Sequence, residues 1–273
     1  MDRTLGSHLT TKIKSPFVRS SLDFYSFCVV GVGRTGSLVA TSLARMGIRQ
    51  LTLIDPDRLE LHNLDAMDSL TTHDLGTLNA ALLTTAIPDS ITTLRAFVSA
   101  KEADVVICCA DNDGARLAAG VIAAVYAKPL LDIGTGVFGT AEARRMGADI
   151  RLILPADRCL LCCGGITDVE QARQIFMAQP VAPRQPWNEE RAGSLRSLNQ
   201  IAAHIGLRVL EDFISERVQE SRWLRLEFDA QGFPSVQVIT PPPALTCPLC
   251  RHRGHGDGGL IAVREILSFW PDR

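Results

Sequence analysis

Short apolar runs alternate with amphipathic stretches along the first half of the chain. These runs predict strands at 27–30, 50–54, 104–110 and 129–133, and the runs at 27–30 and 104–110 have the composition of buried strands. Apolar side chains at helical spacing predict helices over 37–46, 76–87 and 116–127, and a further strand is expected at 91–97. This alternation predicts a doubly wound, mostly parallel α/β sheet, because parallel neighbours need helical crossovers.

The pattern changes after about residue 140. Gly134-Thr135-Gly136 is expected to form a turn, and antiparallel strands are predicted at 141–154, 223–228 and 235–239. A long amphipathic helix is predicted over 193–221, whereas 167–190 is a polar, Pro-containing crossover with no strong period. The expected organisation is an N-terminal arm, a Rossmann-like half, a half with the crossover and long helix, and a C-terminal tail, at 1–24, 25–140, 141–250 and 251–273.

Composition excludes several classes of protein. The formal net charge is −2 and 46% of residues are hydrophobic, which argues against a disordered chain or one that attracts nucleic acid through its charge. We find neither a membrane-spanning apolar run nor a signal peptide, so the expected location is the cytoplasm.

A glycine-rich motif follows the first predicted strand. Gly31-Val32-Gly33-Arg34-Thr35-Gly36 is G-x-G-x-x-G between a strand and a helix, where backbone amides and the helix dipole attract phosphate. Asp55 ends the next strand, 19 residues after Gly36, and can accept hydrogen bonds from a ribose. A tight turn needed only for helix–sheet packing is the alternative, and the motif does not distinguish NAD from ATP.

The eight cysteines need an explanation in a reducing compartment, where disulfides are rare. Two C-x-x-C pairs offer four thiolates to one tetrahedral Zn²⁺, namely Cys159, Cys162, Cys247 and Cys250. Alternatives are a redox C-x-x-C and the use of Cys163 instead of Cys162, whereas His252 and His255 are expected to be solvated. Cys28, Cys108 and Cys109 lie in predicted buried strands and are expected to be core residues.

The segment after Asp55 carries a family resemblance. Residues 55–65 (D-P-D-R-L-E-L-H-N-L-D) resemble the D-x-D-x-V-x-x-x-N-L segment of the ThiF/MoeB/HesA superfamily of ubiquitin-activating-type adenylating enzymes. Further resemblances follow in family order over residues 25–250: Asp74-Leu75-Gly76, Ala110-Asp111-Asn112 with Arg116, Lys128-Pro129-Leu130, and the two cysteine pairs.

The resemblance implies MgATP, attack of a carrier protein's C-terminal carboxylate on the α-phosphate, and release of pyrophosphate. It implies that Asp55 holds the ribose, that Asn63 orients phosphate or ribose oxygens, and that Asp111 holds Mg²⁺. The remaining implied ATP-binding residues are Gly31, Gly33, Arg34, Gly36, Asp57, Arg58, Asn112 and Arg116. A plain helix N-cap is the alternative role for Asp111, and an Asx turn is the alternative for Asn63.

The chain departs from the family pattern in two places, at residues 66–67 and at residue 79. Ala66 stands where the family has Arg, Met67 where it has Gln, and Asn79 where it has a phosphate-contacting Lys. Loss of one charge-stabilising donor costs about 10²–10³ in rate. The explanations are deliberate substitution in a binding trap, which we favour, a natural pseudo-enzyme, and compensation by Arg34, Arg58 or a partner subunit's arm.

The C-terminal half is most similar to the bacterial branch that acts with ubiquitin-like proteins, partly in antiphage defence. This implies a homodimer, a ubiquitin-like tail threaded under the crossover, and a conjugating-enzyme-like acceptor. The acyl group passes directly to that acceptor or through a thioester on Cys163, since 164–246 contains no cysteine. Alternatives are a sulfur-carrier adenylyltransferase, a nicotinamide-dependent oxidoreductase and a non-catalytic scaffold of the same fold.

Overall fold

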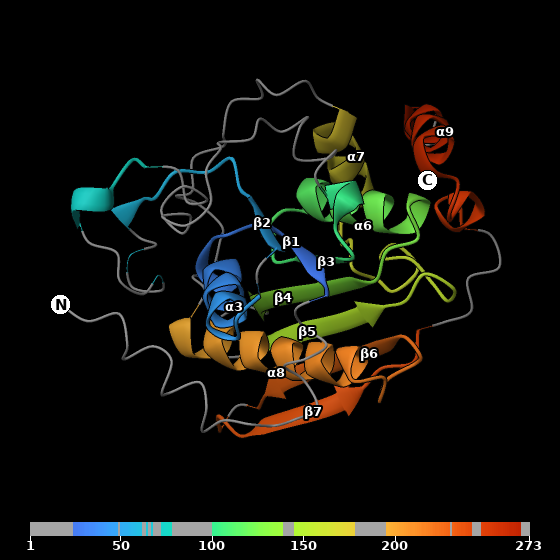
Figure 1. Ribbon diagram of the computed structural model, residues 1–273. Helices are drawn as coiled ribbons and strands as arrows, with labels where there is room; N and C mark the ends of the chain where they lie inside the picture. Colours follow the sequence, from blue (N-terminus) through green and yellow to red (C-terminus); the bar gives the residue numbers. More distant parts are fainter. Residues whose placement is uncertain are drawn as a thin grey trace.

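The computed structural model describes residues 24–48, 50–61, 64, 67, 72–77, 100–138, 145–177, 195–229, 231–241 and 247–268. These residues form a seven-stranded sheet with helices on both faces (Figure 1). Most of the predicted helix over 76–87, the predicted strand at 91–97 and the arm up to residue 23 lie outside the described residues. Among the helices described, none is long and apolar enough to cross a membrane.

The sheet has the order β2-β1-β3-β4-β5-β6-β7. Its first four members pair in parallel and are β1 (Ser26–Val30), β2 (Gln50–Ile54), β3 (Val105–Cys108) and β4 (Leu130–Phe138). The rest are antiparallel and are β5 (Arg145–Ile153), β6 (Arg222–Phe228) and β7 (Pro234–Val238). The predicted parallel sheet with an antiparallel extension is therefore confirmed.

Two helical layers bury the two faces of the sheet (Figure 1). One layer holds α3 (Arg34–Arg45) and α8 (Arg196–Ile214), and the other holds α6 (Asp113–Val125), α7 (Val169–Met177) and α9 (Gly256–Ser268). Val105 and Ile107 of β3 pack into the first core, whereas Val106 and Cys108 pack into the second. This alternation makes β3 a strand buried on both faces, as its composition predicts. Two 3₁₀ turns complete the described elements, η2 (Thr72–Asp74) and η4 (Cys250–His252).

Three segments differ from expectation. Gly134-Thr135-Gly136 does not form a turn but continues β4, because all three residues pair with β5. Residues 169–177, in the stretch without strong period, form α7. The expected tail contains α9, whose Val263 and Leu267 are buried in the core shared with α6.

Candidate active site

The loops after β1, β2 and β3 meet at one edge of the sheet. The amide of Gly31 donates to the carbonyl of Ile54 (2.8 Å), and the amide of Cys109 donates to the carbonyl of Val30 (2.8 Å). The chain leaves β1 for β2 on one side and returns to β3 on the other, so the strand order reverses beside β1. Ligands of open α/β sheets bind at such a point, outside the carboxyl ends of the strands.

The glycine motif forms the first of these loops. Gly31 has φ +81°, and a Cβ there would lie 2.7 Å from the backbone nitrogen of Ala110. Gly36 lies in the first turn of α3, where a Cβ would collide with the Gly31 carbonyl. Gly33 is the N-cap of α3, and nothing lies within 4 Å of the position its Cβ would take. The loop is therefore tightly packed at two glycines and open at the third, the side from which a phosphate can approach the helix N-terminus.

These surroundings predict losses of stability of different size for alanine at two glycines of one loop. Gly31→Ala forces a side chain into the left-handed region and against Ala110, so the free energy of unfolding should fall by about 2 kcal/mol or more. Gly33→Ala, the matched control, meets open space and should cost about 1 kcal/mol or less. Urea unfolding followed by far-UV circular dichroism measures both. Equal losses for the two variants would contradict this account of the loop.

Asp55 joins the second loop to the first. One carboxylate oxygen accepts from the amide of Val32 (2.7 Å), inside the glycine motif, and the other accepts from the amide of Asp57 (2.7 Å). A carboxylate has about four acceptor positions, so these two bonds are compatible with accepting a ribose hydroxyl as well. Asp55 therefore connects the glycine loop to the end of β2 at this edge of the sheet.

Asp111 and Asn112 follow β3 at the same edge. The side chain of Asn112 accepts from the amide of Ala115 (2.8 Å) and caps α6, so the N-cap is Asn112 and not Asp111. Asp111 is exposed immediately before the cap. An exposed carboxylate at this position suits a hard cation such as Mg²⁺, which binds through one or two carboxylates together with substrate phosphates.

The other predicted nucleotide residues are only partly placed. Arg34 begins α3 beside the loop and is half-buried. The guanidinium of Arg58 donates to the carbonyl of Gly76 (2.7 Å). This hydrogen bond connects the loop after β2 to the turn that follows η2. Asn63, Ala66 and Asn79 lie outside the described residues.

Arg116 is engaged in a buried ionic network that sequence analysis did not identify. Its guanidinium donates to Asp132 of β4 (2.6 Å) and, through Nε, to the carbonyl of Gly165 (2.9 Å). Arg151 of β5 donates to the same Asp132 oxygen (3.0 Å). Burial raises the pKa of Asp132, and the two arginines oppose that shift. Through these contacts Arg116 links α6 to β4 and to Gly165, next to the edge of the sheet that carries Asp111.

The network continues to β6 through Asp149. Asp149 accepts from Arg151 (2.8 Å), from the indole of Trp223 (2.7 Å) and from Arg225 (2.9 Å). Partial burial opposes ionisation, but these hydrogen bonds hold the pKa of Asp149 below its usual value. An acidic residue inside the apolar run of β4, facing an Arg inside the apolar run of β5, is the signal by which the network could have been found.

The two cysteine pairs converge on the α6 side of the sheet. The four sulfurs of Cys159, Cys162, Cys247 and Cys250 lie within 4.8 Å of one another. Cys159 and Cys247 are 3.5 Å apart, as are Cys162 and Cys250. In a tetrahedral site with Zn–S bonds of about 2.3 Å the sulfurs are about 3.8 Å apart, so the cluster fits a closed structural Zn²⁺ site.

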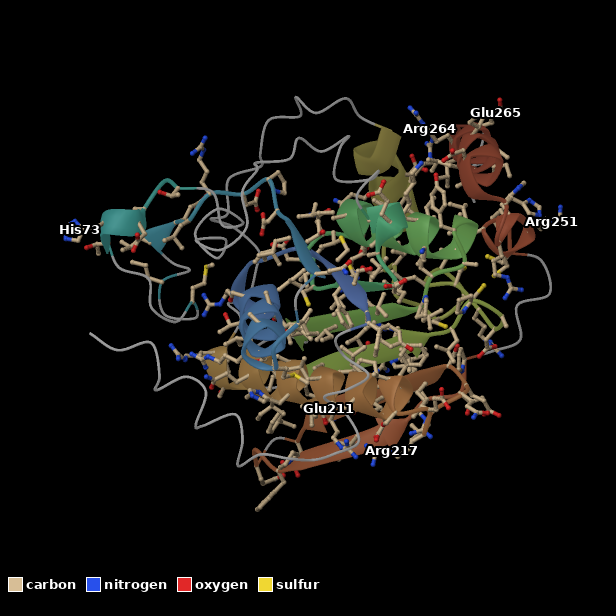
Figure 2. All side chains as sticks on the ribbon, in the orientation of Figure 1. His73, Glu211, Arg217, Arg251, Arg264 and Glu265 are labelled. Carbon is tan, nitrogen blue, oxygen red and sulfur yellow. The ribbon has the colours of Figure 1, made fainter. Side chains whose placement is uncertain are left out.

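The remaining cysteines take other places. Cys163 lies outside the four-sulfur cluster, is 3% exposed, and burial raises its pKa to about 11. Such a thiol does not suit thioester formation, which needs an accessible thiolate. Cys28 and Cys108 are fully buried and Cys109 is partly buried, consistent with packing roles. The four-sulfur cluster lies near the surface of the protein, because Arg251, which directly follows Cys250, is exposed beside α9 (Figure 2).

Comparison with known proteins decides the family. The ThiF family model matches residues 12–203. The chain belongs to the ThiF family. Among curated relatives of this ThiF-family chain, ubiquitin-like modifier-activating enzyme 5 of Drosophila persimilis is 28% identical over 183 residues, which is 57% of this chain and 46% of the relative. The Rattus norvegicus enzyme of the same name is 25% identical over 162 residues, 51% of this chain and 39% of the relative. The chain thus spans less than half the length of these relatives.

Solved structures share the ThiF-family fold. E. coli MccB with MccA-N7isoASN has a TM-score of 0.61 at 18% identity, covering 86% of this chain and 69% of MccB. E. coli MccB with ATP has a TM-score of 0.58 at 18% identity, with 86% and 70% covered. At this identity the likeness concerns the fold alone.

Proposed function

We propose that this ThiF-family chain adenylates the C-terminal carboxylate of a ubiquitin-like protein with MgATP. The observation that carries the proposal is the meeting of Asp55, the glycine loop and Asp111 at the point where the strand order reverses. Family membership adds support, as do relatives named ubiquitin-like modifier-activating enzymes and a fold neighbour crystallised with ATP.

Each group at the edge has a proposed role. The open side of Gly33 and the N-terminus of α3 receive phosphate, and Asp55 accepts a ribose hydroxyl. Asp111 holds Mg²⁺, which when bound neutralises charge on the phosphates. Asn112 and Arg116 keep the start of α6 in place behind Asp111. We further propose that Asp57, Arg58 and Asn63 shape the nucleotide pocket, as the family pattern implies.

The proposed reaction is a displacement at the α-phosphorus. A carboxylate oxygen of the carrier forms a bond to the α-phosphorus while the bond from that phosphorus to the bridging oxygen breaks. The electron pair leaves with pyrophosphate, and the product is an acyl-adenylate, a mixed anhydride that a nucleophile can attack. The protein contributes positioning and charge neutralisation.

A thiol of a conjugating-enzyme-like partner then attacks the acyl carbon of the acyl-adenylate, the bond to AMP breaks, and AMP leaves. Direct transfer is favoured over a thioester on Cys163, because that thiol is buried. We also propose that the chain acts as a homodimer in which a basic arm residue of one subunit completes the other's nucleotide site.

Pyrophosphate exchange into ATP tests the proposal. The probe is a ubiquitin-like protein with a Gly-ended C-terminal tail, compared with the same protein lacking its last two residues. Exchange is expected with the intact tail only, and Asp111→Asn should lower it about 10²–10³-fold by removing a charged Mg²⁺ ligand. Asp229, exposed after β6 at the opposite side of the sheet, supplies the matched control variant Asp229→Asn, which makes the same change of charge. Exchange that is independent of the tail, or binding of NAD in place of ATP by calorimetry, would reject the proposal.

A further inference from the structure

One carboxylate oxygen at the start of α6 gathers three donors from a distant segment. Oδ2 of Asp113 accepts from the amide of Thr167 (2.9 Å), the hydroxyl of Thr167 (2.5 Å) and the amide of Asp168 (2.7 Å). Asp168 in turn accepts from the amide of Gln171 (2.9 Å), in the first turn of α7. Asp113 therefore fixes the point at which α7 begins.

Two arginines hold the residues just before Thr167. Nε of Arg116 donates to the carbonyl of Gly165 (2.9 Å), and Arg151 donates to the carbonyls of Cys163 (3.0 Å) and Gly164 (3.2 Å). We call residues 163–168 the post-knuckle segment, because it directly follows Cys159 and Cys162 of the four-sulfur cluster. Side chains of α6 and β5 thus clamp this segment along its length.

The residues proposed to bind nucleotide lie at the same end of α6. Asp111 and Asn112 immediately precede Asp113, and Gly31 packs against the backbone of Ala110. Arg116 also reaches the carbonyl of Ala110 (3.5 Å). A shift of residues 110–112 when nucleotide binds would therefore be transmitted to Asp113 and Arg116, and from them to the post-knuckle segment.

We infer that Asp113 is a positioning residue that couples nucleotide binding at Asp111 to the post-knuckle segment and α7. The inference rests on the proposed function, since it needs a nucleotide at this edge. Asp113 acts through the segment it anchors, which leads along the chain into the crossover between α7 and α8. Because coupling is reciprocal, a nucleotide that stabilises the ordered α7 also binds more tightly when α7 is ordered.

Hydrogen exchange of residues 167–177, with and without MgATP, tests the coupling. In the native chain MgATP should slow exchange of these amides at least threefold. In Asp113→Asn the nucleotide-free amides of Thr167 and Asp168 should exchange about tenfold faster or more, because a charged acceptor is lost. MgATP should then no longer slow exchange in α7, and the calorimetric Kd for MgATP should rise, by up to the factor by which MgATP slows exchange in the native chain.

Asp104 offers a matched control at the opposite end of β3. Its Oδ2 also accepts from one backbone amide and one hydroxyl, both of Ser26 (2.8 and 2.7 Å). Asp104→Asn should loosen Ser26 yet keep both the nucleotide effect on α7 and the Kd. If Asp113→Asn does not fold, Thr167→Val removes one donor of the same anchor and should weaken the coupling in the same direction.

Each contrary outcome is distinct. Unchanged exchange at Thr167 and Asp168 in Asp113→Asn would show that the Asp113 carboxylate does not stabilise the post-knuckle segment. Faster exchange with an undiminished MgATP effect would overturn the coupling while leaving the proposed function intact. Failure of the native chain to bind MgATP would overturn the coupling together with the proposed function, whereas the nucleotide-free exchange still decides whether Asp113 is an anchor.

Discussion

Serine in place of Cys159 or Cys247 is expected to abolish stoichiometric zinc and to release the C-terminal segment from the sheet. The native chain should carry one Zn²⁺, held by the four sulfurs that lie within 4.8 Å of one another. Structural Zn²⁺ contributes about 10–16 kcal/mol of apparent binding free energy in small peptides, against a total stability of about 5–15 kcal/mol for a domain. The free energy of unfolding should therefore fall by several kcal/mol, and α9 should lose hydrogen-exchange protection.

Cys163 supplies the control for the zinc experiment. It is buried next to Cys162 but lies outside the cluster, so Cys163→Ala should keep one zinc per chain. Metal content by atomic emission and unfolding in urea would be measured for these three variants and for Cys162→Ser. Zinc loss in Cys163→Ala with retention in Cys162→Ser would show that Cys163, not Cys162, is the fourth ligand.

Placing cations at the two positions where the family has them should increase the rate of adenylation by a large factor. Ala66→Arg combined with Asn79→Lys places charge where the family has it, and pyrophosphate exchange should rise about 10²–10³-fold for each donor that reaches the phosphates. The single variants and Ala66→Gln with Asn79→Gln, which add length without charge, are the controls.

The rate of the double variant also discriminates between the explanations for the missing cations. A large gain favours substitution of an otherwise intact enzyme. No gain, with exchange already measurable in the native chain, favours compensation by Arg34, Arg58 or an arm residue of a partner subunit. No exchange in either form, with MgATP still bound, favours a non-catalytic scaffold.

Sequence was most informative where burial is complete. The apolar runs that became β1 and β3 lie between two helical layers, so nearly every position in them is apolar and the strands are evident. The glycine motif was equally clear, since the close approach of Gly31 to Ala110 and the contact of Gly36 with Gly31 leave no room for another residue.

Tertiary contacts determined what sequence did not reveal. Gly134 continues a strand because β5 pairs along it. A glycine suits this position because a Cβ there would lie 2.8 Å from Nη1 of Arg116. The start of α7 depends on Asp113, 54 residues from Thr167, which no local pattern can show. The apolar face of α9 is short, and its partner on α6 lies more than a hundred residues away.

The residues of the candidate site also fall into two groups, those that local sequence predicts and those that only tertiary contacts reveal. Asp55 and Asp111 were predicted as site residues because each comes at or just after the end of a strand, and the structure places both at one edge of the sheet. Asp132, Arg151 and Asp149 were missed because their importance lies in mutual contacts across β4, β5 and β6. The family motif also assigned Arg116 to ATP, whereas the structure directs its guanidinium to Asp132 and Gly165.

The separation of the two cysteine pairs along the chain has a thermodynamic consequence. Cys159 and Cys247 are 88 residues apart, as are Cys162 and Cys250, and α8 with the β6–β7 hairpin lies between them. In an unfolded chain, bringing such distant pairs together costs loop-closure entropy, so each pair alone is a poor chelator. Tight zinc binding and the folding of the intervening chain are therefore two measurements of one equilibrium, and a zinc titration reports the stability of a region that contains no ligand.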